Sequence, residues 1–156
     1  MIYVIFTLIV FIDQFTKYLA VEKLMGNPPF VIINNFFQFN YVENYGAAFG
    51  ILQNQQLFFI IATCVIIIGI IIFMKINNTL TKFMNISLIL ILAGAFGNLI
   101  DRIRLGYVVD FLDVKFGNFY DYPVFNIADS SIVIASFIII YLVLSDKYEI
   151  ADKKNI

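Results

Sequence analysis

Four long apolar stretches constrain this chain more than any other feature of its sequence. They cover residues 2–21, 57–74, 83–100 and 124–144. Each is close to the roughly 20 residues that an α-helix needs to cross about 30 Å of hydrocarbon. Hydrophobic residues make up 62% of the chain and charged residues only 13%, a composition far from that of soluble domains. The sequence therefore predicts an all-α polytopic membrane protein with four transmembrane helices, in one domain over residues 1–156.

The first stretch has the length of a secretory signal but lacks two features of one. No basic segment precedes it, and Asp13 and Lys17 interrupt a region that would be purely apolar in a signal. We therefore expect residues 2–21 to remain as a span.

Charge does not decide the orientation of the four spans. Four crossings place both ends of the chain on one side of the membrane, and cytoplasmic segments normally carry the excess of Lys and Arg. Five such residues lie on the side of the two ends, and five lie on the opposite side. The first group is Lys75, Lys82, Lys147, Lys153 and Lys154, and the second is Lys17, Lys23, Arg102, Arg104 and Lys115.

Two longer connections, residues 25–55 and 103–122, are expected at one face of the membrane. The first contains "FFQFNYVEN", in which aromatic and polar residues alternate, and this period of two is typical of a strand. The aromatic face comprises Phe37, Phe39 and Tyr41, and the polar face comprises Gln38 and Asn40. The sequence thus predicts a small β element at this face of the membrane, and Pro123 is expected to open the fourth helix.

The lack of histidine and the single cysteine exclude whole classes of chemistry. Ser-His-Asp and Cys-His sites and His-ligated zinc require His, and the chain has none. Its one cysteine, Cys64, lies within an apolar stretch, where packing is the favoured role. A net charge of -1 gives no signal for nucleic-acid binding. We expect no metal and no other cofactor, so any hydrolysis must depend on carboxylates or on a Lys paired with Ser or Thr.

Several polar residues occur inside the apolar stretches, where charges are costly unless they are paired or face a wet cavity. Asn98, Asp101 and Arg102 have spacings of i, i+3 and i+4 and share one helix face. An Asp–Arg pair at a helix end, with its charges at the membrane surface, explains them as well as a functional site does. Asp13 and Lys17 are spaced i, i+4, and a neutralised pair is the favoured interpretation.

Two further acids lie beyond the third stretch and at the start of the fourth. Asp129 follows Asn126 by three residues, so its role could be to stabilise the start of the fourth helix through the helix dipole. Asp110 lies between apolar neighbours in "YVVDFL", a setting that raises the pKa of a carboxyl and suits it to carry a proton. Asp110 is therefore the stronger candidate for chemistry.

Five motifs of this sequence, taken in order, resemble those of a known family. They are "DQFTK", "NYGAAFG", "AGAFGNLIDR", "VVDF" and "FNIADSS". With four spans around them, they closely resemble the bacterial lipoprotein signal peptidases, also called signal peptidase II, from about residue 10 to residue 145. One departure is Ala93, where many members of the family have Gly.

The resemblance implies an intramembrane aspartic endopeptidase that removes the signal peptide from a prolipoprotein, cutting before a Cys that carries diacylglyceryl. Its catalytic residues would be Asp110 and Asp129. Other positions that the family places around its site are Asp13, Lys17, Asn44, Gly46, Asn98, Asp101, Arg102 and Asn126. Asp113 and Asp121 match no motif, and we expect them to be surface acids whose replacement is mild.

The resemblance also implies where the protein lies and what it contacts. Both termini would be cytoplasmic in the bacterial inner membrane, with the acids at the extracytoplasmic face. The partners would be the lipid-modified prolipoprotein and membrane lipid, with no nucleic acid. The enzyme would act as a monomer without a cofactor.

Two other classes of protein remain open on the residues alone. A small transporter or ion-binding protein would use the charged residues of the spans as a polar pathway. Such a pathway needs polar residues in both halves of the bilayer, whereas the second and fourth stretches are apolar apart from Thr63, Ser136 and Tyr141. A non-catalytic assembly subunit would tolerate the loss of its aspartates.

Overall fold

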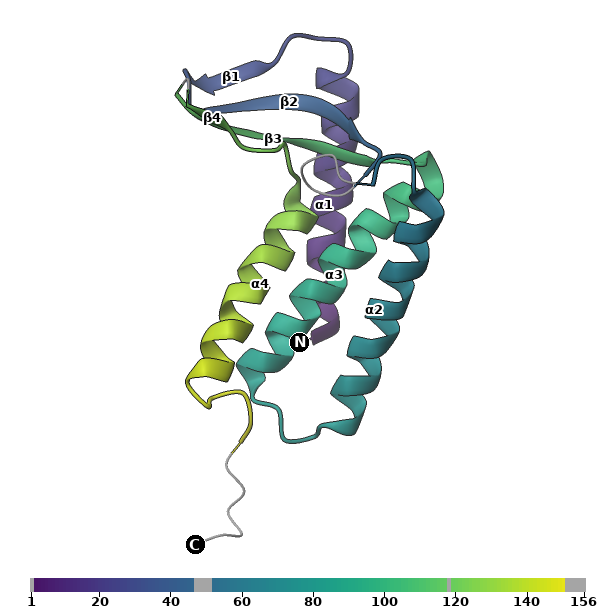
Figure 1. The fold of residues 1–156 in the computed structure, drawn as a ribbon, viewed down its shortest axis with the longest axis vertical. Helices are drawn as coiled ribbons and strands as arrows, with labels where there is room; N and C mark the ends of the chain where they lie inside the picture. Colours follow the sequence, from purple (N-terminus) through teal and green to yellow (C-terminus); the bar gives the residue numbers. More distant parts are fainter. Residues whose placement is uncertain (1, 47–51, 118, 151–156) are drawn as a thin grey trace, which may run out of the picture.

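Four helices stand side by side, and a small sheet lies across one end of the bundle (Figure 1). The computed structural model describes residues 2–46, 52–117 and 119–150. Within them the helices are α1 (Ile2–Leu24), α2 (Gln56–Ile76), α3 (Lys82–Leu105) and α4 (Ile127–Leu144). The strands are β1 (Phe30–Ile33), β2 (Phe37–Asn44), β3 (Val108–Phe116) and β4 (Tyr120–Asp121).

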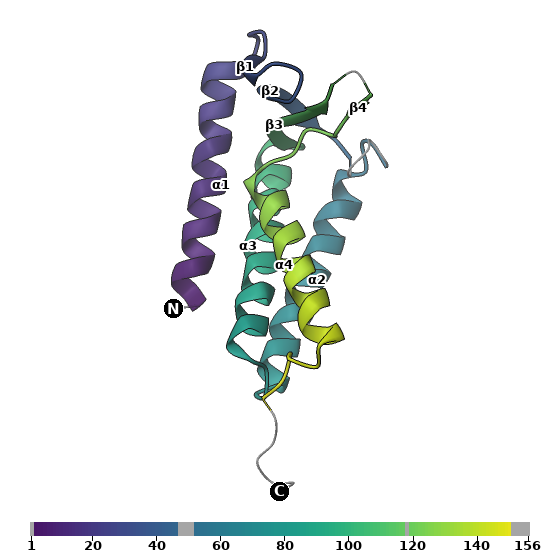
Figure 2. The ribbon, with the colours of Figure 1, turned by 90° about the vertical axis from the view of Figure 1, so that its left-hand side faces the viewer.

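All four helices are long and apolar enough to cross a membrane. The helix α3 contacts each of the other three, and Figure 2 shows α1 on one side of it and α2 and α4 on the other. In α2 none of residues 56–76, all of which the structure describes, is buried. So large an apolar surface would be a liability in water, whereas hydrocarbon solvates it. The expected four-helix membrane protein with a small β element is confirmed.

The fourth helix begins later than the sequence indicates. The expectation that Pro123 opens α4 is wrong, because the helix starts only after Asn126. Phe125 exchanges two backbone hydrogen bonds with Leu112 of β3, at 2.8 and 3.0 Å. These bonds hold the chain extended up to Asn126, whose side chain then caps the helix.

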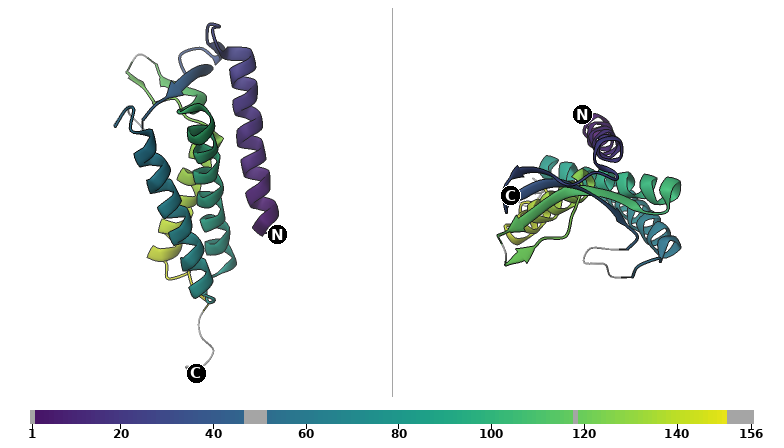
Figure 3. Two further views of the ribbon diagram at one scale, coloured as in Figure 1. Left: turned by 90° about the vertical axis from the view of Figure 1, so that its right-hand side faces the viewer. Right: turned by 90° about the horizontal axis from the view of Figure 1, so that it is seen from above.

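The sheet has the order β1-β2-β3-β4 with antiparallel neighbours throughout. It joins the segment between α1 and α2 to the segment between α3 and α4, and it spans the top of the bundle (Figure 3). The sequence predicts a strand for β2 but only a surface segment for β3. The expected alternation along β2 is interrupted by a β-bulge between Phe39 and Val42.

Two apolar clusters hold the two ends of the molecule. Under the sheet, Ala20 of α1 packs against Val109 and Phe111 of β3. The cluster at the opposite end of the bundle consists of Leu80, Met84, Leu88 and Leu142. The sheet is therefore fixed to α1, and the far end of the bundle is closed by hydrocarbon.

Candidate active site

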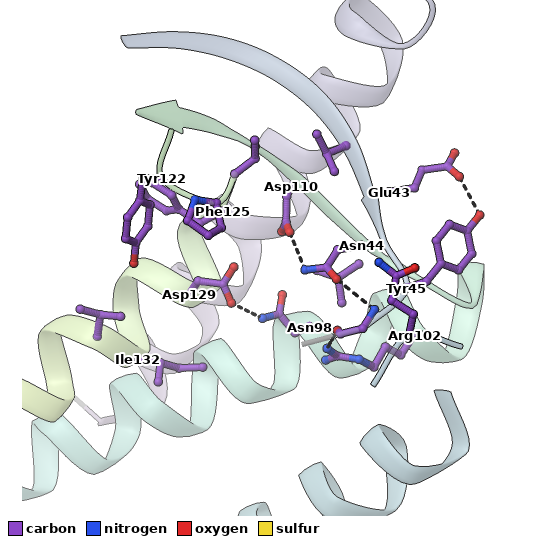
Figure 4. Close-up of a pocket in the computed structure, with 17 residues that line it drawn as sticks. Glu43, Asn44, Tyr45, Asn98, Arg102, Asp110, Tyr122, Phe125, Asp129 and Ile132 are labelled. Carbon is purple, nitrogen blue, oxygen red and sulfur yellow. Dashed lines mark hydrogen bonds between the residues drawn. The ribbon is translucent and has the colours of Figure 1, made fainter. Parts of the chain in front are cut away.

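Asp110 is the third residue of β3, and its carboxylate points down toward the helices (Figure 4). Only 1% of the residue is exposed. Its Oδ1 accepts a hydrogen bond from Asn126 Nδ2 at 2.7 Å, and its Oδ2 accepts one from Asn44 Nδ2 at 2.9 Å. Donors from the start of α4 and from β2 thus hold this carboxylate in one orientation.

The surroundings of Asp110 favour its protonated form. Burial, and secondly the nearby charge of Asp129, raise the pKa of the Asp110 carboxyl from 3.8 to about 7. The hydrogen bonds from Asn44 and Asn126 lower this pKa, because they stabilise the charged form. Asp110 can therefore hold a proton near neutral pH, the property that its apolar sequence neighbours indicate.

Asp129 lies in the first turn of α4 and serves two purposes there. Together with Asn126 it forms a capping box: Asn126 Oδ1 accepts from the Asp129 backbone N–H at 2.9 Å, and Asp129 Oδ2 accepts from the Asn126 N–H at 3.2 Å. Its Oδ1 accepts a further hydrogen bond from Asn98 Nδ2 at 2.7 Å. Asp129 is thus both a helix-start residue and a neighbour of α3.

Two asparagines join the carboxylates to one another. Asn126, which is fully buried, donates from Nδ2 to Asn98 Oδ1 at 3.1 Å as well as to Asp110. Asn98 in turn donates to Asp129. The two acids therefore belong to one hydrogen-bonded group, and Figure 4 shows Asp110, Asn98 and Asp129 around a common space.

Lys17 forms the charged centre behind this group. Its Nζ lies 2.9 Å from Asp13 Oδ2, 2.9 Å from Asp101 Oδ2 and 2.8 Å from Asn98 Oδ1. The exposed fraction of Lys17 is 3%, and both acids are buried as well. The expected i, i+4 pair of Asp13 and Lys17 is present, and it extends to α3 as a triad.

Each of the two acids bound to Lys17 also holds a backbone N–H beside a candidate catalytic residue. Asp13 Oδ1 accepts from the N–H of Ala128 at 2.9 Å, directly before Asp129. Asp101 Oδ2 accepts from the N–H of Val109 at 3.2 Å, directly before Asp110. The triad therefore fixes the start of α4 and the start of β3 relative to each other.

Gln14 belongs to the same group, although no sequence pattern predicted a role for it. Its Nε2 donates to Asp101 Oδ1 at 3.0 Å, to Asp13 Oδ2 at 3.2 Å and to the carbonyl oxygen of Gly97 at 3.2 Å. Its one signal is adjacency to Asp13 in "DQFTK".

Small residues of α3 allow the helices to approach this closely. A Cβ built on Gly97 would lie 2.5 Å from Asp13 Oδ2, and one on Gly94 would collide with the carbonyl oxygen of Ala128. The small residues of "AGAFG" therefore permit close packing of α3 against α1 and α4. This packing serves the site directly, because the missing side chain of Gly97 leaves room for the carboxylate of Asp13.

Arg102, Asn44 and Gly46 form the rim of the site. Asn44 Oδ1 accepts from the N–H of Gly46 at 3.0 Å, and Arg102 Nη2 donates to the Gly46 carbonyl oxygen at 3.3 Å. The guanidinium also lies 5.0 Å from the ring centre of Phe59, a cation–π distance. Residues 47–50 of the "NYGAAFG" motif lie outside the described residues.

A cavity of about 490 Å³ opens against these residues. Its polar lining includes Asn44, Asn98, Arg102, Asp110 and Asp129. Its apolar lining includes Val42, Val108, Phe125, Ile132 and Val133. Two carboxylates that face a small cavity with apolar walls can exchange protons with water. They can also exchange protons with a polar group of an otherwise apolar molecule bound there.

The structure brings together every residue that the sequence places at the site. An unbroken series of contacts joins Asp13, Lys17, Asn44, Gly46, Asn98, Asp101, Arg102, Asp110, Asn126 and Asp129. Across residues 2–46, 52–117 and 119–150, no group of three His, Cys, Asp or Glu side chains is arranged to hold a metal ion.

One expectation about the remaining acids is wrong. Asp113 is not a surface acid, because only 4% of it is exposed and its Oδ2 accepts a hydrogen bond from Gln38 Nε2 at 2.6 Å. Asp121 is largely exposed, and it lies 3.8 Å from Lys115 Nζ. The burial of Asp113 could not be predicted, because it depends on the pairing of β3 with β2, and the sequence analysis expected only a surface segment there.

Comparison with known proteins now decides the family. A family model described as signal peptidase (SPase) II matches residues 5–145. The chain belongs to the signal peptidase II family. The lipoprotein signal peptidase of Caldanaerobacter subterraneus subsp. tengcongensis is 51% identical over 143 residues, which cover 90% of this chain and 94% of that protein. The lipoprotein signal peptidase of Staphylococcus aureus is 41% identical over 147 residues, covering 94% and 89%.

Solved structures agree with the sequence relatives. A structure described as a bacterial membrane enzyme matches with a TM-score of 0.83 at 38% identity, covering 99% of this chain and 92% of the other. A second such structure matches with a TM-score of 0.81 at the same identity. Membership of the signal peptidase II family, with four helices able to span a membrane, identifies a membrane-embedded protease.

Proposed function

We propose that this protein is an intramembrane aspartic endopeptidase that removes the signal peptide from prolipoproteins. Cleavage falls just before a Cys that carries diacylglyceryl. The observation that carries the proposal is the pair Asp110 and Asp129, which are linked through the hydrogen-bonded asparagines Asn126 and Asn98 and line one cavity. Family membership supports the choice of substrate.

The two carboxylates share one proton in this mechanism. The charged member of the pair takes a proton from a water molecule, while the neutral member donates a hydrogen bond to the scissile carbonyl oxygen. The water oxygen bonds to the carbonyl carbon, and the C–N bond then breaks as a proton passes to the leaving amine. The raised pKa of Asp110, about 7, keeps a proton available for this exchange. The apparent pKa values belong to the pair.

The asparagines hold the pair without supplying charge. Asn44 and Asn126 donate to Asp110, and Asn98 donates to Asp129. Lys17 stays behind the asparagines, where it neutralises Asp13 and Asp101. The pair Asp110 and Asp129, called the dyad below, therefore does not form an ion pair with Lys17 and can keep its shared proton.

The substrate reaches the site from the lipid, so that its acyl chains never leave hydrocarbon. We place the sheet and the dyad at the extracytoplasmic face of the inner membrane and both termini in the cytoplasm. The helix α1 begins, and α4 ends, at the end of the bundle away from the sheet (Figure 1), which is consistent with this orientation. One chain supplies every residue of the proposed site, which supports a monomeric enzyme.

A gel-shift assay tests the proposal. A purified diacylglyceryl-modified prolipoprotein is incubated with wild type, Asp110→Asn and Asp129→Asn in detergent, with Asp121→Asn as the matched control for loss of an acid. We expect both dyad variants to lose cleavage by at least about 1000-fold while remaining folded, and Asp121→Asn to cleave normally. Normal turnover by either dyad variant would rule out the aspartic mechanism.

A further inference from the structure

Asp113 is a buried acid that the proposed mechanism does not use. Among the described residues, no Lys or Arg nitrogen lies within 4 Å of its carboxylate. Its Oδ2 instead accepts two amide hydrogen bonds from β2, one from Gln38 Nε2 at 2.6 Å and one from Asn40 Nδ2 at 3.4 Å. Burying a carboxylate without a cation is costly, so a carboxylate at this position needs a structural reason.

The two amides lie at an irregularity in β2. Phe39 pairs with Leu112 of β3, and the next pair joins Val42 to Asp110. The strand β2 therefore advances three residues while β3 advances two, which is the one-residue excess of a β-bulge. Asn40 lies inside this bulge, so one of the two hydrogen bonds to the acid comes from the bulge itself.

The bulge decides which side chains of β2 face Asp110. Asn44 pairs with Val108, which is two residues from Asp110 and so lies on the same face of the strand. Asn44 can therefore reach the Asp110 carboxylate, at 2.9 Å. Without the extra residue, the register that precedes the bulge would pair Glu43 with Val108 and turn Asn44 to the opposite face.

We propose that Asp113 is a positioning residue, which fixes the bulge through Gln38 and Asn40 and thereby sets Asn44 against Asp110. The inference rests on the proposed aspartic mechanism. Asp113 lies outside the described lining of the cavity, and three residues along a strand place it on the other face from Asp110. It acts on the reaction through Asn44 and does not touch substrate.

This route through Asn44 has its own signature in the pH dependence. The hydrogen bond from Asn44 lowers the pKa of Asp110, so its loss raises that pKa. The other charged groups that face Asp110 are Asp129 from α4, Lys17 from α1 and Arg102 from α3. A substitution at Asp113 leaves all three in place. The basic limb of the pH–rate profile then moves to higher pH.

The test compares three variants for cleavage of a diacylglyceryl-modified prolipoprotein peptide over a range of pH. Asp113→Leu removes the acceptor, Asp113→Asn keeps one, and Asp121→Asn is the exposed control on the neighbouring strand. We expect Asp113→Leu to lower kcat by about 10- to 100-fold, with a smaller change in KM and an upward shift of the basic limb. Asp113→Asn recovers most of the activity, and Asp121→Asn matches wild type.

Two further variants separate positioning from misfolding. Gln38→Met removes the shorter hydrogen bond from the other strand, and it must move the basic limb in the same direction even where Asp113→Leu fails to fold. In an Asn44→Ala background, Asp113→Leu must cause no further shift. Wild-type kcat and pH profile in folded Asp113→Leu, or a shift that persists in full without Asn44, overturns the assignment. Cleavage by Asp110→Asn in the same assay would instead overturn the aspartic mechanism itself.

Discussion

Asp110 is the residue through which pH acts most directly on this site. Its pKa of about 7 in the folded protein lies above the ordinary value of 3.8. Between these two values the folded protein holds a proton that the unfolded chain has lost. The contribution of Asp110 to the free energy of unfolding is therefore fully present below pH 3.8 and falls as pH rises through about 7.

We expect cleavage and stability to report this proton together. Cleavage falls as pH rises through about 7, because the pair loses the proton that it must share. Thermal unfolding in detergent gives the second measurement: Asp110→Asn removes this part of the pH dependence, so its Tm rises relative to wild type as pH increases from 3.8 to about 7. Parallel Tm curves for the two proteins would contradict the assigned pKa.

Lys17 neutralises two buried acids at once, so its removal leaves both uncompensated. We expect Lys17→Met to lower the free energy of unfolding by about 3–5 kcal/mol, the cost of breaking a buried ion pair, as measured by SDS-induced unfolding. The matched control is Lys115→Met, whose pair with Asp121 is 3.8 Å long and partly exposed, and which should cost less than about 1 kcal/mol. Equal effects of the two substitutions would show that the triad does not hold the helices together.

At the scale of helices, the contact between α1 and α3 is set by the absence of a side chain at Gly97. A Cβ there would lie 2.5 Å from Asp13 Oδ2, so the acid or the whole helix must move. Because Asp13 also holds the start of α4 at Ala128, that movement reaches Asp129. The effect of adding one methyl group to α3 therefore extends to the opposite side of the site.

We expect Gly97→Ala to reduce kcat strongly and to lower the free energy of unfolding by about 1–3 kcal/mol, as overpacking does. The matched control is Gly69→Ala in α2, where a Cβ meets no atom of the described residues within 4 Å. Alanine favours a helix over glycine, so this control should be neutral or slightly stabilising. Wild-type kcat in Gly97→Ala would mean that α1 and α3 can separate enough to accommodate a methyl group without disturbing the site.

At the scale of the whole molecule, the buried charged side chains of the described residues all lie toward the end that carries the sheet. The dyad and its supporting residues lie beneath the sheet, and the opposite end is closed by Leu80, Met84, Leu88 and Leu142. A polar pathway through the bilayer would need polar residues in both halves of the membrane. The transporter alternative is left without support.

The proposed orientation is open to chemical labelling. In a Cys64→Ala background, Asp121→Cys places a thiol on the sheet, and Asn78→Cys places one in the link between α2 and α3 at the opposite end. We expect a membrane-impermeant maleimide to label the first in spheroplasts and to label the second only after lysis. The reverse pattern would invert the topology and move the dyad to the cytoplasmic face.

Helical spacing predicted only part of the candidate site, and the family resemblance supplied the other residues. Spacings of i, i+3 and i+4 correctly place Asn98 and Asp101 on one face, because they depend only on the helix period. The bond from Lys17 to Asp101 was not predictable, since it joins two helices whose relative rotation is set by Gly97 and its neighbours. Asp113 was misread for a similar reason, because its burial depends on a strand pairing that local sequence does not encode.

A protein whose helices differ so much in burial should not tolerate mutation evenly. None of residues 56–76 in α2, all of them described, is buried, so most of these positions are selected for solubility in lipid rather than for shape. Ile, Leu, Val and Phe are nearly interchangeable under that criterion. Over generations α2 is free to drift among them, whereas α3 is held residue by residue. In the laboratory, α2 is accordingly the helix that can carry a fluorescent or spin label with least harm to the enzyme.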